Sequence, residues 1–192
     1  MMRAINQAAF CALALFALTM LAASATAWAA PDTDELAARL ADNAPQCGRF
    51  EQTRWLADLD SQLESRGTFE HQDAGLVWQT TSPINDRVVL SADNDELPMG
   101  FQAVAPVLGG LLSGDWQALE RYFAIELSGT QDEWQAKLTP SEANIAQRLD
   151  HLLVHGNQQV ERVEIAFTND DRLELALSGA DCERLEDDKH TP

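Results

Sequence analysis

Basic residues are scarce in this chain of 192 residues, which has 13 Lys and Arg against 31 Asp and Glu and a formal net charge of −18. Nucleic-acid binding depends on a basic surface that neutralises phosphates, so this balance argues against a nucleic-acid partner. Attachment to an anionic membrane surface also needs basic segments and is disfavoured for the same reason. The composition, 45% hydrophobic and 23% charged, is otherwise typical of a soluble globular protein.

Motifs of the common enzyme and metal sites are also missing. The chain has no G-x-S-x-G elbow, no Cys-x-x-Cys and no H-E-x-x-H. No carboxylate pair stands out that would serve glycosidase chemistry. His151 and His155 have the spacing of a zinc pair on a helix, but on the strand expected there they lie about 13 Å apart, at roughly 3.3 Å per residue. We therefore expect no catalytic residue, no metal and no cofactor.

Residues 1–29 have the composition of a cleaved secretory signal peptide. Arg3 is their only charged residue, an apolar run follows, and Ala27 and Ala29 fit the A-x-A cleavage rule. A transmembrane anchor, the alternative, needs about 20 apolar residues and usually a charged stop, and a processing site stands there instead. We expect cleavage after Ala29 and an exported, soluble protein that carries a formal charge of −19.

Export leaves two cysteines, Cys47 and Cys182, in an oxidising compartment. A disulfide between them would close a loop of about 135 residues, which the chain-entropy model values at about 4–5 kcal/mol. Two free thiols are the alternative. The mature chain has the length of one domain, which we expect over residues 30–180, followed by an acidic polar tail over residues 181–192.

Most of the mature chain has the pattern of short antiparallel strands. The expected strands are residues 48–57, 63–71, 75–81, 86–92, 125–129, 133–140, 149–156, 160–168 and 172–178. In the last two, apolar side chains alternate with charged or small ones, as in a sheet with one face in water. Turn signals at residues 73–75 and 169–171 predict tight connections between neighbouring strands.

Helices are expected before the strands and in the middle of the chain. Residues 32–44 form an amphipathic pattern with Asp32 or Thr33 as the cap. Residues 103–124 predict two helices, the second capped by Asp115, and the first is so apolar that it must be buried or cover something apolar. The fold class is therefore α+β, a strongly curved antiparallel sheet forming an incomplete, half-open β-barrel with helices covering the concave side.

Such an arrangement often encloses an apolar ligand cavity. The candidate lining residues are Phe50, Leu76, Trp78, Phe101, Val107, Leu108, Leu111, Leu112, Ile165 and Phe167. The alternative is that they form a filled core. Arg54 and Arg66 flank the first hairpin, where they are expected to pair with Glu51 or Glu64 or else to contact a cargo head group or an exporter loop.

Four short motifs occur in an order that resembles a known family. They are F-x-Q-x-R at residues 50–54, S-R-G-x-F at 65–69, G-L-V-W-Q-T-T-S-P at 75–83 and W-Q-A-K-L-T-P at 134–140. Together with the closing hairpin, they resemble a divergent branch of the periplasmic outer-membrane lipoprotein carrier proteins (LolA-like) of Gram-negative bacteria. The likeness runs from about residue 47 to residue 178. One departure is residues 71–74, which lack the arginine that latches the lid of the classical carrier.

The resemblance implies a half-barrel closed by a helical lid, with a cavity that holds the acyl chains of its cargo. It implies a monomeric, non-enzymatic periplasmic carrier that takes a lipidated protein or another lipid from an inner-membrane exporter to an outer-membrane acceptor. Two other functions stay open: a periplasmic adaptor or structural protein with a filled core, and an accessory protein of a lipid or polyene exporter.

Overall fold

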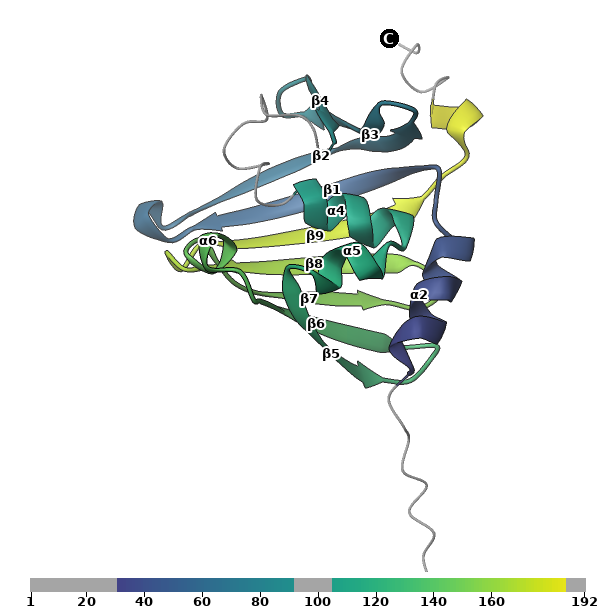
Figure 1. Ribbon diagram of the computed structural model, residues 1–192. Helices are drawn as coiled ribbons and strands as arrows, with labels where there is room; N and C mark the ends of the chain where they lie inside the picture. The colour runs from purple at the N-terminus through teal and green to yellow at the C-terminus, as the bar shows by residue number, and fades with distance from the viewer. Residues whose placement is uncertain (1–30, 92–104, 186–192) are drawn as a thin grey trace, which may run out of the picture.

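The structure, a computed structural model, describes residues 31–91 and 105–185 (Figure 1). The expected signal peptide, Phe101 and the end of the expected acidic tail lie outside these residues. None of the helices within the two described ranges combines the length and the apolar composition needed to cross a membrane.

Within these ranges the chain forms one antiparallel sheet of nine strands, ordered β4-β3-β2-β1-β9-β8-β7-β6-β5. The strands are β1 (Cys47–Leu56), β2 (Ser61–Gln72), β3 (Gly75–Ser82), β4 (Asp86–Leu90), β5 (Phe123–Gly129), β6 (Trp134–Pro140), β7 (Leu149–Gly156), β8 (Val160–Phe167) and β9 (Arg172–Gly179). β1 pairs with both β2 and β9, which joins the two halves of the chain. β4 and β5 form the two edges, so the sheet does not close.

Each strand expected from the sequence is present. The predicted segment 149–156 coincides with β7, whereas β2 begins two residues before the prediction and β5 starts at Phe123. A nine-stranded, unclosed antiparallel sheet with helices confirms the predicted α+β half-barrel.

Helices cover one face of the sheet, which we call the inner face (Figure 1). They are α2 (Thr33–Asp42), α4 (Ala105–Ser113) and α5 (Trp116–Glu120), while α6 (Ala143–Ala146) and the 3₁₀ turn η1 (Ala57–Leu59) lie at strand connections. Asp32 caps α2 by accepting hydrogen bonds from the backbone N–H groups of Asp34 and Glu35. Asp115 caps α5 through the N–H of Ala118, as its position in the sequence predicted.

The break between α4 and α5 depends on a glycine. Gly114 has a φ of +72°, and a Cβ added there would lie 2.4 Å from the backbone nitrogen of Ala41 in α2. Only glycine combines this left-handed backbone with so close an approach. The glycine therefore turns the chain and lets this connection pack directly on α2.

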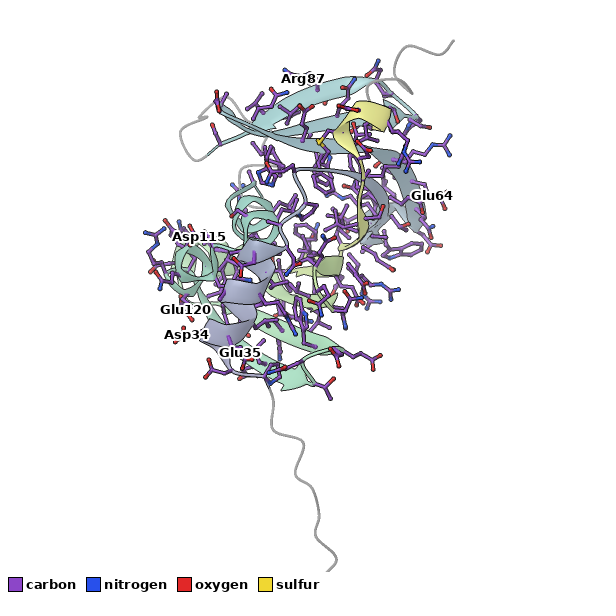
Figure 2. All side chains as sticks on the ribbon, turned by 90° about the vertical axis from the view of Figure 1, so that its right-hand side faces the viewer. Asp34, Glu35, Glu64, Arg87, Asp115 and Glu120 are labelled. Atoms are coloured by element: carbon purple, nitrogen blue, oxygen red, sulfur yellow. A yellow bond between two sulfur atoms is a disulfide. The ribbon has the colours of Figure 1, made fainter. Side chains whose placement is uncertain are left out.

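Alternation along the strands separates a dry face from a wet one. In β8, Val163 and Ile165 are buried while Arg162 is exposed, and in β1 Phe50 is buried while Glu51 is exposed. The buried inner-face side chains pack with those of the helices in one cluster, in which the rings of Trp116 in α5 and Trp134 in β6 meet edge to face. Figure 2 shows acidic residues on the outside of this helical layer, among them Asp34 and Glu35 of α2, Glu120 of α5 and Asp115, which caps α5.

The beginning of the expected tail is part of the folded body. Cys182 forms a disulfide with Cys47, with the Cα atoms 5.3 Å apart, and residues 182–185 are helical. Leu185 is only 4% exposed. It lines a depression of about 310 Å³ with residues of β1, β2 and β3. Residues 181–185 are thus anchored to the sheet, unlike the solvated tail expected there.

Candidate functional site

The candidate cavity residues that the structure describes lie together on the inner face and on α4. The members with exposures of 2–3% are Phe50, Leu76, Trp78, Val107, Leu108, Leu111, Leu112 and Ile165. Phe167 is half-buried and packs against this cluster, and Phe101 lies outside the described residues. The candidates chosen from the sequence pattern that the structure describes therefore belong to one cluster between the sheet and the helices.

Aromatic rings form the part of this cluster that belongs to the first hairpin. The ring of Trp78 stacks on Phe50, with centroids 3.9 Å apart, and lies nearly parallel to Phe69 at 6.2 Å. All three side chains point to the inner face because their positions pair across β1, β2 and β3. The stack makes a flat apolar wall on one side of the half-barrel.

The helix α4 contributes the opposite, aliphatic side. Its sequence, APVLGGLLS, contains no charged residue. It contacts α2, α5 and β4. Val107, Leu108, Leu111 and Leu112 are all buried on it. The expectation that this helix is buried is correct, and it holds its place by apolar packing.

At one end of the sheet the inner face is less covered. Arg54 of β1 pairs in register with Leu63 of β2 and with Leu173 of β9, and Phe167 ends β8 beside them. Leu63 is 55% exposed and the Arg54 side chain is 38% exposed, whereas Phe167 and Leu173 are half-buried. We call these four residues the exposed end of the inner face.

Arg54 forms an ion pair with Asp171. The sequence analysis expected Glu51 or Glu64 as the partner, and that expectation is wrong for Arg54. Its Nη2 lies 3.2 Å from Oδ2 of Asp171, and its Cζ lies 5.7 Å from the centre of the Phe167 ring. Glu51 and Glu64 belong to the outer face by strand alternation. A residue pointing inward must find its partner elsewhere, and the turn between β8 and β9 provides one.

Asp171 is the buried member of this pair. Its Oδ1 accepts a hydrogen bond of 2.9 Å from the backbone N–H of Ala57 in η1. This backbone hydrogen bond, together with the bonds from Arg54 and Asn169, holds the pKa of Asp171 below its ordinary value despite the opposing effect of burial. Asp171 therefore stays ionised and ties the β1–β2 connection to the β8–β9 turn.

The three histidines within the described residues lie on both faces of the sheet. His151 and His155 lie on the outer face of β7, with ring nitrogens 2.7 Å from Asp150 and 3.6 Å from Glu164. His71 is the penultimate residue of β2, and burial lowers the pKa of its imidazole. Across residues 31–91 and 105–185, no group of three His, Cys, Asp or Glu side chains is arranged to hold a metal.

The outer face has a depression that sequence reasoning missed. It has a volume of about 490 Å³ and is lined by residues of β1, β7, β8 and β9, among them Trp55, Leu153 and Glu164. Trp55 is 36% exposed. Alternation in β1 places Trp55 outward, which was the signal available, but a groove across four strands depends on their pairing.

Comparison with known proteins finds a family that part of the chain resembles. Residues 100–186 match the family model of outer membrane lipoprotein carrier protein LolA-like, a stretch that includes α4 and the strands from β5 to β9. No curated protein matches the chain.

The solved structures that match the chain share little sequence with it. A LolA superfamily protein from Nitrosomonas europaea is 11% identical, with 79% of this chain and 95% of that chain covered and a TM-score of 0.37. The MucA/MucB complex of Pseudomonas aeruginosa gives 14% identity, 81% and 60% coverage and a TM-score of 0.41. A putative outer membrane lipoprotein-sorting protein domain from Vibrio parahaemolyticus gives 11% identity, 82% and 99% coverage and a TM-score of 0.34. The family match over residues 100–186 supports the resemblance to a divergent LolA-like family that the order of the sequence motifs predicted.

Proposed function

We propose that this protein is a periplasmic carrier that binds the acyl chains of a lipidated protein or another lipid on the inner face of its half-barrel. It takes this cargo from an inner-membrane exporter towards the outer membrane. The observation that carries the proposal is the uncharged helix α4, which lies with an apolar sheet face in one buried cluster, in a chain with a LolA-like family match.

The free energy of binding an acyl chain can be estimated from the apolar surface that packs against α4. The side chains of Leu108, Leu111 and Leu112 are packed in the same cluster as Phe50 and Trp78 of the sheet. An acyl chain offers the same kind of surface and gains about 0.8 kcal/mol for each CH₂ that leaves water. A chain of about sixteen carbons thus gains roughly 12 kcal/mol before ordering costs.

Direct detection of a bound lipid tests the carrier. The mature protein is purified from its native compartment, and lipids that remain bound are identified by mass spectrometry. Displacement of a fluorescent apolar probe by added lipid then reports occupancy of the same site. A wild-type protein that carries no lipid and binds no probe would contradict the proposal.

A matched pair of leucines tests whether α4 borders the site. Leu108 is buried on α4, whereas Leu59 in η1 is 70% exposed. Leu108→Asp is expected to weaken probe binding by about tenfold or more, because a carboxylate would then face the acyl chain. Leu59→Asp adds the same charge and is expected to leave binding unchanged. Thermal unfolding shows whether each variant is folded at the assay temperature.

A periplasmic adaptor is the second candidate. The depression of about 490 Å³ beside the half-exposed Trp55 on the outer face favours it, because an exposed aromatic side chain in a hollow suits a protein partner. An adaptor with a filled core excludes the apolar probe. Probe binding by wild type therefore separates the carrier from the adaptor.

A further inference from the structure

We infer that Arg54 recognises the acyl oxygen at the head of the cargo, the carbonyl oxygen of an ester or a carboxylate oxygen, while the chain lies on the apolar residues beside it. This inference rests on the proposed function, since it assigns a head-group contact within the same lipid site. It selects ligands whose apolar chain ends in a hydrogen-bond acceptor.

Unused donors on Arg54 are the first observation. A guanidinium has five N–H donors, and Asp171 accepts from Nη2. Nε is buried and has no hydrogen-bond partner in the part of the chain that the structure describes. Because a buried donor without a partner is unfavourable, an oxygen supplied by a ligand would stabilise this side chain.

The surroundings of Arg54 are the second observation. Its guanidinium lies over the ring of Phe167, and its neighbours in register are Leu63 and Leu173. Leu173 in turn pairs with Ile165, which belongs to the buried cluster. The apolar surface beside the donor group is therefore continuous with the buried cluster to which α4 also belongs, so an amphiphile with its head at Arg54 would lay its chain on this surface.

The net charge of the Arg54–Asp171 pair also determines which head groups bind there. Asp171 stays ionised and balances the charge of Arg54, so the pair is neutral overall. A neutral pair with spare N–H donors suits an ester carbonyl as well as a carboxylate. A quaternary ammonium head accepts no hydrogen bond and gains nothing from Arg54.

Three ligands with the same chain length test the head-group contact. We would measure displacement of an apolar probe by laurate, monolauroylglycerol and dodecyltrimethylammonium at near-physiological salt. The variant is the double substitution Arg54→Gln and Asp171→Asn, which removes both charges and leaves no unpaired buried ion. Its expected effect is a loss of about tenfold or more for the two acyl ligands and no change for the ammonium ligand.

Arg66→Gln is the matched control, because Arg66 lies opposite Glu51 on the outer face. It removes an arginine charge without touching the exposed end and is expected to leave all three affinities unchanged. Asp171→Asn alone leaves Arg54 uncompensated and is expected to tighten laurate binding more than monolauroylglycerol binding. That comparison separates a carboxylate source from an ester source.

The outcomes that overturn the inference differ from those that overturn the carrier. Equal losses for all three ligands in the double variant would show that Arg54 and Asp171 only hold the fold. Unchanged affinities would also exclude the head-group contact, although the carrier would stand. A wild-type protein that binds none of the three ligands would overturn both proposals.

Discussion

Asp171 joins segments that lie more than a hundred positions apart in the sequence. It accepts hydrogen bonds from the backbone of Ala57 and from Arg54, at sequence separations of 114 and 117. A carboxylate held by two donors is stabilised in its charged form, and this lowers its pKa in the folded state. The contribution of Asp171 to stability is therefore linked to pH.

Asp171→Asn is expected to lower the free energy of unfolding by about 1–2 kcal/mol at pH 7, since it weakens a charge-assisted pair. The folded-state pKa lies below the ordinary value of 3.8. The unfolded chain therefore binds more protons between those two values, and stability falls as the pH falls through them. The difference between wild type and the variant should shrink below about pH 4.

Urea unfolding at pH 7, 4 and 3 measures this difference. Asp170→Asn is the control, because Asp170 is the exposed neighbour in the same turn. A difference that stays constant from pH 7 to pH 3 would show that the lowered pKa of Asp171 does not contribute.

The direction in which Arg54 points follows from the sequence, whereas its partner does not. Alternation with Phe50 and Gln52 places Arg54 on the inner face. Asp171 is one of two adjacent aspartates in an Asn-Asp-Asp turn, and nothing in the sequence distinguishes them. The backbone conformation of the turn determines which aspartate pairs with Arg54. Asp170 adopts a φ of 66°, and Asp171 is the residue turned towards β1.

At the scale of elements, two glycines near α4 have different roles. Gly109 lies within the helix, and Gly114 follows it in the turn to α5. At Gly109 an added Cβ would meet nothing within 4 Å, whereas at Gly114 it would meet the backbone of Ala41. Gly109 therefore lowers the stability of the helix, whereas Gly114 is required by the turn that follows it.

Gly114→Ala is expected to lower the free energy of unfolding by about 1–3 kcal/mol, because a φ of +72° strains an L-residue and the new methyl group meets α2. Gly109→Ala is expected to raise it by up to about 1 kcal/mol through helix propensity. Chemical denaturation of both variants measures the contrast. Equal effects would show that the α4–α5 turn does not require the left-handed conformation.

Strands and helices were predictable because their signals are local. Alternation, caps and turn residues are each read within a few positions, and they placed every strand from β1 to β9. The attachment of residues 181–185 to the sheet was not predicted, because this segment is mostly polar and is held by the disulfide of Cys182 and by the burial of Leu185 against the first three strands. Long-range contacts of this kind leave no periodic signal.

At the scale of the whole molecule, the disulfide connects the first strand to the end of the described chain. Cys47 and Cys182 are 135 positions apart, so the bond closes a loop that contains most of the described residues. The chain-entropy model assigns such a loop about 4–5 kcal/mol, and measured native disulfides give about 2–5 kcal/mol.

Replacing both cysteines by serine is expected to lower the free energy of unfolding by about 2–5 kcal/mol, because the unfolded chain regains its freedom. Guanidinium unfolding of the variant and of wild type in non-reducing buffer measures the loss. Titration of thiols in the denatured, unreduced protein is the control. Two free thiols per chain would contradict the bond.

The two sheet edges set a further property of the half-barrel. The radius of a closed barrel is fixed by its strand number and shear. A ligand too large for the interior is therefore excluded unless hydrogen bonds between strands break. Here β4 and β5 are not paired with each other, and their separation can change while every strand-to-strand pairing is kept. The distance between the two edges of the sheet is therefore adjustable by bending, so the proposed carrier function would extend to cargoes of unequal thickness.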